Sequence, residues 1–146
     1  MKPFQFSLQS VLDYRTEVER TTALQFQKSQ QEVDVFERIL EELTQELNRL
    51  GTYLEEKDQL TAQELQQSSQ YRTHLGEQLL IQRQNLAHAK RKQELTHQAW
   101  MQAYQEKEMM EKLKAKQYES YQEEVVKQEA HQLEEYSRML HYPSQW

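Results

Sequence analysis

Histidines and paired carboxylates are the side chains with which this sequence could bind a metal or transfer a proton. None of its five histidines shows the His-Glu-x-x-His spacing that places two zinc ligands on one helical face. The chain contains no cysteine, which excludes thiolate ligands and thiol nucleophiles. We therefore expect no metal site and no cofactor. The histidines, which we expect to be surface residues, are His74, His88, His97, His131 and His141.

Adjacent carboxylates are frequent, as at Glu41-Glu42 and Glu123-Glu124. General acid–base catalysis needs such a group in a shaped site that shifts its pKa, and a thin helical hairpin offers no such cleft. A glycine-rich phosphate loop cannot be built from two glycines. A Ser-His-Asp arrangement would require converging loops. The sequence therefore predicts a nonenzymatic protein.

Composition limits the elements that could position any functional side chain. Of 146 residues, 36% are hydrophobic and 29% are charged, with two Gly and two Pro. Sandwiches, barrels and α/β folds need turn residues at about every tenth position, so these folds are excluded. We expect an all-α chain of long helices with narrow apolar faces, organised as a single domain over residues 1–146.

The net charge of −6 argues against nucleic acid as the main ligand, because phosphate binding needs a basic surface. One basic run, Lys90-Arg91-Lys92, is interpreted as a solvated helix face, with a site for an acidic partner as the alternative. The sequence has no apolar run long enough to span a membrane and no signal peptide at its start. We expect a cytoplasmic protein without direct membrane insertion.

The strongest periodic signal lies in the first half of the chain and is typical of a coiled-coil seam. One set of apolar residues recurs every seventh position, and a second set follows three residues behind it. Before Phe26 the same frame meets polar residues, so the predicted seam is weaker there. The apolar positions are Phe26, Val33, Leu40, Leu47 and Leu54 with Phe36, Leu43 and Leu50, and the polar ones are Arg15, Glu19, Thr22 and Ser29.

A turn is expected where this seam stops. Ser7 is a reasonable N-cap for the first helix, and Thr61 with Glu64 matches the capping box of a second helix. We predict helix 1 at about 7–57, the turn at about 57–61 and helix 2 at about 61–140. The two helices would form an antiparallel coiled-coil hairpin. The expected seam of helix 2 consists of Leu65, Leu75, Leu79, Leu86, Ala89, Trp100, Ala103, Met110 and Leu113.

Helix 2 must extend beyond helix 1, whose N-terminal end near Leu8 is expected to lie opposite about residue 111. We expect the C-terminal overhang to be a partner-binding segment, with a frayed tail as the alternative. At the other end, Tyr53 and Tyr71 flank the turn as an interaction patch or as simple packing. The overhang residues without an expected intrachain partner are Leu113, Tyr118, Tyr121, Val125, Val126, Leu133, Tyr136, Met139 and Leu140.

Three segments, in order and spacing, resemble the FliJ family, the small coiled-coil components of the flagellar type III export apparatus. The first is Phe4-x-Phe6-x-Leu8-x-x-Val11-Leu12-x-x-Arg15, and the second is Ala62-Gln63-Glu64-Leu65 followed by Tyr71 and Leu75. The third comprises Met110-Glu111-Lys112-Leu113-Lys114, then Tyr121, Glu129 and Leu133-Glu134-Glu135, where the family commonly has Leu-Asp-Glu.

The resemblance implies a nonenzymatic central stalk, similar to the coiled-coil part of the rotary-ATPase γ subunit, that serves flagellum biogenesis, motility and chemotaxis. Its implied partners are the hexameric export ATPase (FliI), the cytoplasmic domain of the export gate (FlhA) and export chaperones, which would place it peripherally at the inner membrane. The implied ATPase-ring-binding residues are Leu8, Leu12, Arg15, Leu113, Tyr121, Val125 and Leu133. The implied export-gate-binding residues are Leu50, Tyr53, Tyr71 and Leu75.

Two other functions fit the residues. A general chaperone could hold unfolded export substrates with the amphipathic overhang, and a homodimeric coiled-coil tether could pair two overhangs.

Overall fold

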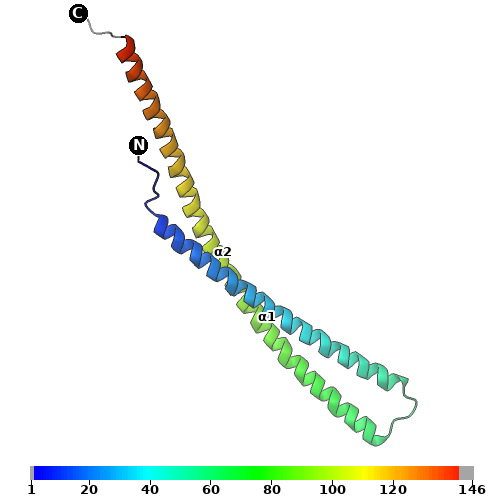
Figure 1. Ribbon diagram of the computed structural model, residues 1–146. Helices are drawn as coiled ribbons and strands as arrows, with labels where there is room; N and C mark the ends of the chain where they lie inside the picture. The colour runs from blue at the N-terminus through cyan, green and yellow to red at the C-terminus, as the bar shows by residue number, and fades with distance from the viewer. Residues whose placement is uncertain (1, 142–146) are drawn as a thin grey trace, which may run out of the picture. The chain divides into compact units, whose positions relative to one another are not determined.

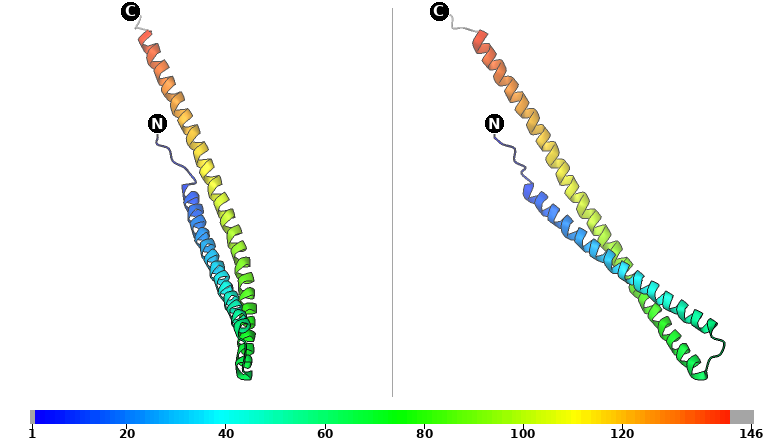
Figure 2. Two further views of the ribbon diagram at one scale, coloured as in Figure 1. Left: turned by 90° about the vertical axis from the view of Figure 1, so that its right-hand side faces the viewer. Right: turned by 45° about the vertical axis from the view of Figure 1, so that its right-hand side comes forward.

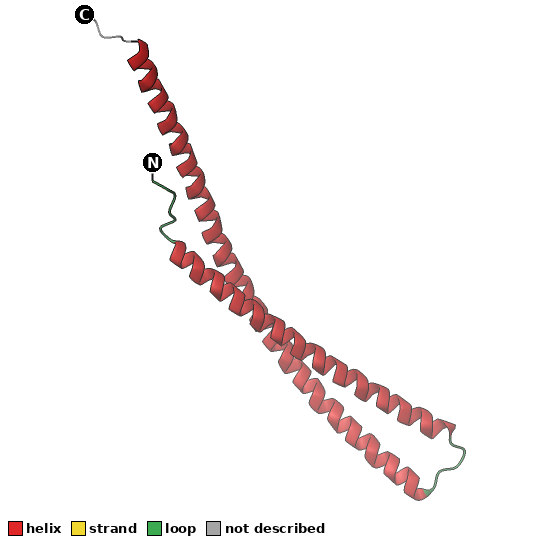
Figure 3. Cartoon of the chain, viewed as in Figure 1, coloured by secondary structure: helices red, strands yellow, loops and turns green. Residues whose placement is uncertain are grey.

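The computed structural model describes residues 2–141 and consists of two helices joined by a short loop (Figures 1 and 3). Helix α1 spans Gln9–Glu56 and helix α2 spans Ala62–His141. Residues 2–141 contain no strand. The predicted all-α hairpin with a longer second helix is therefore confirmed.

The contacts divide the chain into two units through which both helices run. The loop unit is Thr21–Met101, and the terminal unit combines Met1–Arg20 with Gln102–Trp146. Residues 1 and 142–146 lie outside the described part of the chain, and a single domain over residues 1–146 stays a prediction.

The loop unit holds α1 and α2 antiparallel, because its cross-helix contacts step forward on one helix and backward on the other. Glu46 contacts Tyr71 near the loop, and Glu32 contacts Lys92 farther from it. The seam between them is closed by apolar side chains of both helices, which are buried at Val33, Leu75, Leu79 and Ala89. This packing confirms the seam that the heptad spacing predicts.

One polar layer interrupts the apolar seam of the loop unit. Ser29 is 1% exposed and its hydroxyl lies 2.7 Å from that of Thr96. Each hydroxyl also lies within hydrogen-bonding distance of a carbonyl of its own helix, 2.7 Å from that of Phe26 and 3.0 Å from that of Gln93, so one hydroxyl donates to the other and the second donates to its own carbonyl. The layer is therefore fully hydrogen-bonded and does not leave an unsatisfied polar group. Next to it, the rings of Phe26 and Trp100 stack with centroids 5.7 Å apart.

The terminal unit continues the heptad frame, but polar residues alternate with apolar ones such as Leu12 and Ala103 at its seam positions. The Glu19 carboxylate lies 3.7 Å from Lys107 Nζ, with the two side chains 17% and 20% exposed. Gln9 Oε1 accepts a hydrogen bond from Lys114 Nζ at 2.8 Å. The predicted weakness of the seam before Phe26 thus takes a specific form, in which Gln9, Arg15 and Glu19 meet charged partners on α2.

Leu65 and Leu113 were expected in the seam of α2, and the structure corrects both positions. Leu65 is 57% exposed, because Ser68, seven residues before Leu75, holds the half-buried position. Leu113 is exposed because Lys114, four residues after Met110, holds the next one. Each leucine is directly next in sequence to a half-buried residue, so its side chain points about 100° away from the packing face of α2.

The helix starts follow different capping patterns. The amide of Glu64 donates to Thr61 Oγ1 at 3.1 Å, which confirms Thr61 as an N-cap. At α1, the amide of Leu12 donates to the Leu8 carbonyl, so Leu8 rather than Ser7 is the N-cap position. Ser7 instead lies in a turn in which the amide of Gln9 donates to the Phe6 carbonyl.

Candidate functional sites

All seven residues of the implied ring-binding set lie in the terminal unit, but their side chains differ in how far they are exposed to a partner. Leu12 is buried against α2, and Arg15 forms a 2.6 Å ion pair with Glu106. These two side chains help to join the helices of this unit. Leu8, Leu113 and Leu133 are exposed, and Tyr121 and Val125 are half-buried.

The ring-binding set is spread along α2 instead of forming one compact site. Leu133 follows Tyr121 by twelve residues, which places it about 18 Å farther along the helix. A partner would therefore have to follow the helix for several turns to contact both residues.

The N-terminal segment, residues 2–8, packs on α2 and changes the expected extent of the overhang. The Phe4 ring lies 5.2 Å from Tyr118 and 5.5 Å from Tyr121, measured between centroids. The Tyr121 hydroxyl donates to the Lys2 carbonyl at 2.6 Å. The prediction that Tyr118 and Tyr121 lack intrachain partners is wrong, because the chain before α1 extends far enough to reach them.

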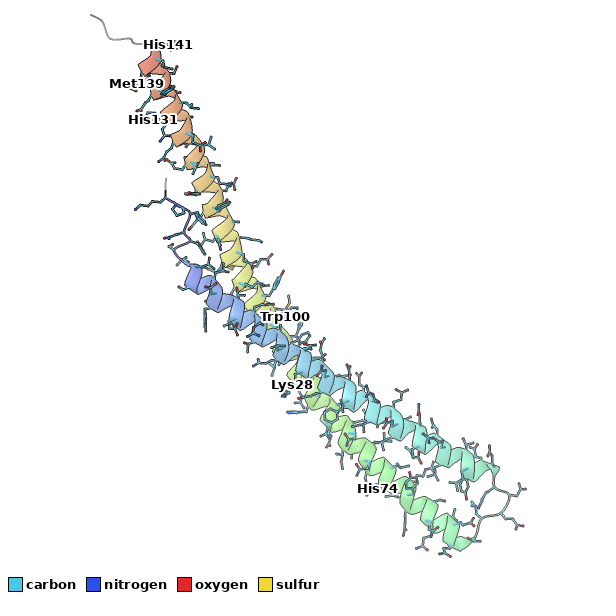
Figure 4. The ribbon with its side chains drawn as sticks, viewed as in Figure 1. Lys28, His74, Trp100, His131, Met139 and His141 are labelled. Carbon is cyan, nitrogen blue, oxygen red and sulfur yellow. The ribbon has the colours of Figure 1, made fainter. Side chains whose placement is uncertain are left out.

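Beyond these tyrosines, no second helix within the described residues 2–141 faces the last turns of α2 (Figure 2). Figure 4 labels His131 and Met139 on these turns, where the side chains project from a single helix. Large apolar side chains of this stretch are strongly exposed; Met139, at 76%, is the most exposed of them. They are Val126, Leu133, Tyr136, Met139 and Leu140.

The implied gate-binding residues all belong to the loop unit. Leu75 is 4% exposed and Leu50 is half-buried, so these two residues mainly pack the seam. Tyr53 and Tyr71 are about half exposed, at 48% and 41%. The accessible part of this set is therefore the tyrosine pair.

Charged groups orient both tyrosines. The Tyr71 hydroxyl donates to Glu46 Oε1 at 3.0 Å, and this hydrogen bond raises the pKa of Tyr71 above its ordinary value. The Lys57 ammonium lies 5.1 Å from the centre of the Tyr53 ring and 3.0 Å from Glu64 Oε2. Hydrogen bonding raises the pKa of Lys57, and the bond with Tyr53 contributes more than the bond with Glu64. The 57–61 loop thus carries a cation held between α1 and α2.

The residues considered for metal binding and catalysis are not brought together. Across residues 2–141, no three His, Asp or Glu side chains cluster as a metal site. His131 pairs with Glu135 one turn along the same helix, at 3.1 Å. In the basic run, Lys90 and Lys92 form ion pairs across the seam with Glu37 and Glu32, at 3.9 and 3.4 Å. That run therefore has a structural contact that neither interpretation of its sequence included.

Two helices packed antiparallel through a heptad seam define a coiled-coil hairpin protein. A family model described as flagellar FliJ protein matches residues 4–145, and the chain belongs to this FliJ family. Membership makes it a flagellar export apparatus component of structural type, as the sequence resemblance implied. No curated protein and no solved structure matched the chain.

No helix among the described residues is long and apolar enough to cross a membrane.

The contact of Phe4 with Tyr118 is the main feature of the terminal unit that sequence reasoning missed. Its signal in the sequence is the Phe4-x-Phe6 pair before a helix start.

Proposed function

We propose that this chain is a central stalk and escort of the flagellar type III export apparatus, without an enzymatic activity of its own. The observation that carries the proposal is the family match over residues 4–145. The terminal unit would bind the hexameric export ATPase, and the tyrosine pair Tyr53 and Tyr71 would bind the cytoplasmic domain of the export gate. Export chaperones are further partners in this proposal.

The exposed apolar residues of α2 support the ATPase assignment. Leu133 and Leu140 are 69% and 64% exposed on the last turns of α2, which no other helix of the described residues 2–141 faces. Contiguous exposed apolar side chains of this size usually mark an interaction site. Ring and gate binding would hold the protein peripherally at the inner membrane, where it would serve flagellum assembly, motility and chemotaxis.

Stimulation of the cognate export ATPase tests the ring-binding role. Leu133→Ala and the double substitution Leu113→Ala with Tyr121→Ala should each reduce stimulation. Leu95→Ala is a matched control, because Leu95 is 66% exposed on the same helix but belongs to the loop unit. The proposal fails if the unaltered chain changes neither ATPase activity nor ring assembly.

Binding to the isolated gate domain tests the proposed gate-binding role of Tyr53 and Tyr71. Tyr53→Ala and Tyr71→Ala should weaken binding, each by about 1–3 kcal/mol for an aromatic interface residue. Tyr14→Ala is the control, because Tyr14 is 63% exposed in the terminal unit. Equal losses for all three variants would contradict a gate site at the 57–61 loop.

Sedimentation equilibrium separates the stalk from the homodimeric tether. A monomer keeps the exposed end of α2 free for a partner, whereas a tight dimer contradicts the monomeric stalk. Binding of unfolded export substrates with no effect on the ATPase would instead favour the general chaperone.

A further inference from the structure

The segment before α1 is held against α2 by a small number of contacts. Phe6 is 7% exposed and anchors the segment at its α1 end. Farther out, the observed contacts are the two ring contacts of Phe4 and the hydrogen bond from Tyr121 to the Lys2 carbonyl. Residues 2–8 therefore form a short cover with a firm inner end and a lightly held outer end.

Open grooves on both sides of Phe4 show that this cover does not seal the surface it crosses. One groove, of about 500 Å³, is lined by Phe4, Leu12, Lys114 and Tyr118 among others. The second, of about 420 Å³, is lined by Phe4, Gln5 and Phe6 together with Gln9 and Lys114. Because Phe4 lines both grooves and its ring contacts Tyr118, displacing this one side chain would widen both grooves and uncover the Tyr118 ring.

The helical face under the cover continues past the polar residues Glu129 and Gln132 to exposed apolar residues. At 100° per residue, Tyr118, Tyr121 and Val125 share one face of α2 with Tyr136 and Leu140. Phe4 occupies the beginning of this face, and the part from Tyr136 onward is exposed. A partner that follows the face from Leu140 toward α1 would meet the cover at Tyr121.

We propose that residues 2–8 are an autoinhibitory cover, and that the partner bound by the end of α2 displaces Phe4 to reach Tyr118 and Tyr121. This inference rests on the proposed binding of the export ATPase by the terminal unit. The cover would lower the apparent affinity, because only the fraction of molecules with Phe4 displaced can bind through the whole face.

Cross-linking provides a reversible test in the full chain. The sequence contains no cysteine, so Gln5→Cys with Gln117→Cys introduces a unique pair. Gln5 lines a groove with Lys114, and Gln117 lies one turn farther along α2. A bis-maleimide with a cleavable disulfide would hold the cover closed until reductant is added, and the cleaved protein is the matched control.

The expected result is at least a tenfold weaker binding of the cognate ATPase by the cross-linked form, with recovery after cleavage. Phe4→Ala should act in the opposite direction and strengthen binding about fivefold, the equivalent of one aromatic pair of about 1 kcal/mol. Gln5→Ala, an exposed neighbour of Phe4, should have no effect.

Three outcomes overturn the inference in distinguishable ways. Equal binding by the cross-linked and cleaved forms overturns the cover and leaves the proposed function standing. Weaker binding by Phe4→Ala has the same meaning, because Phe4 would then be a contact residue for the ATPase. Absence of binding by the unaltered chain and by every variant overturns the proposed function, and the cover with it.

Discussion

The loop unit and the terminal unit share one heptad frame, but different kinds of side chain fill its seam positions in the two units. In the loop unit the α1 frame is apolar from Val33 to Leu54, and a polar layer of Ser29 with Thr96 precedes this stretch. In the terminal unit it carries ion pairs and polar contacts, such as Glu19 with Lys107. One periodicity therefore supports two kinds of helix pairing.

This difference between apolar and polar seam residues assigns them different effects, on the stability of the hairpin and on the specificity of its register. Apolar seam residues contribute most of the free energy of folding, but they accept neighbouring registers and a second copy of the same helix equally well. Polar seam residues contribute little or cost stability, yet they require one particular partner. We infer that the loop unit supplies stability to the hairpin, and that the polar layers restrict it to one register.

The largest effect should follow from a cavity in the apolar seam. Leu79 is 9% exposed in the loop unit, and Leu79→Ala should lower the free energy of unfolding by about 2–3 kcal/mol. Chemical denaturation monitored by circular dichroism measures this loss. Leu80→Ala is the control, because Leu80 is 60% exposed and should change stability by less than about 0.5 kcal/mol. Similar losses at the two positions would show that the seam is not the source of stability.

A charge reversal in the terminal unit should have a smaller effect that a partner change can repair. Glu19→Lys places two cations together at Lys107 and should cost about 1–2 kcal/mol, since the pair is only partly exposed. Lys107→Glu in the same chain should restore most of the loss. A double-mutant cycle measures the coupling energy. Additive effects would mean that this pair does not specify the register.

The apolar seam and the second helix start could be predicted because each is a local pattern. The seven-residue spacing from Phe26 to Leu54 defines a face without knowledge of the partner helix. The Thr61 hydroxyl accepts a hydrogen bond from the amide of Glu64 within the first turn of α2, whereas the Glu64 carboxylate pairs with Lys57. Both predictions depend on residues that lie within a few turns of each other.

The polar layers and the cover could not be derived in the same way. Glu19 alone is an unfavourable seam residue, and its partner Lys107 is identified only when the register is known. Phe4 precedes α1 in a segment without periodicity, and its contact with Tyr118 depends on how that segment crosses the helix. Pattern reasoning therefore predicted most of the packing face of each helix, but it did not identify the polar pairs that meet across the seam.

Removal of the polar layer in the loop unit should test specificity with little change in stability. Ser29→Ala with Thr96→Val keeps the side-chain volumes similar and removes both hydroxyls. We expect a change of about 1 kcal/mol or less, because both partners of the hydrogen bond are replaced together. Sedimentation and spin-label distances across the seam should then reveal dimers or shifted registers. A strictly monomeric variant with unchanged distances would contradict a specificity role for this layer.

The smallest effect concerns the tyrosine pair near the loop, where a single hydrogen bond links the helices. Glu46 raises the pKa of Tyr71 above its ordinary value of 10.0, so the bond is present at neutral pH and is lost as the pH rises through the raised pKa. Glu46→Gln should lower the pKa of Tyr71 toward 10.0, because an uncharged amide no longer opposes ionisation of the phenol. Carbon NMR of labelled tyrosine rings can follow Tyr71 separately from the other tyrosines. An unchanged titration would show that Glu46 does not hold Tyr71 in solution, and the proposed gate patch would then lack an anchored side chain.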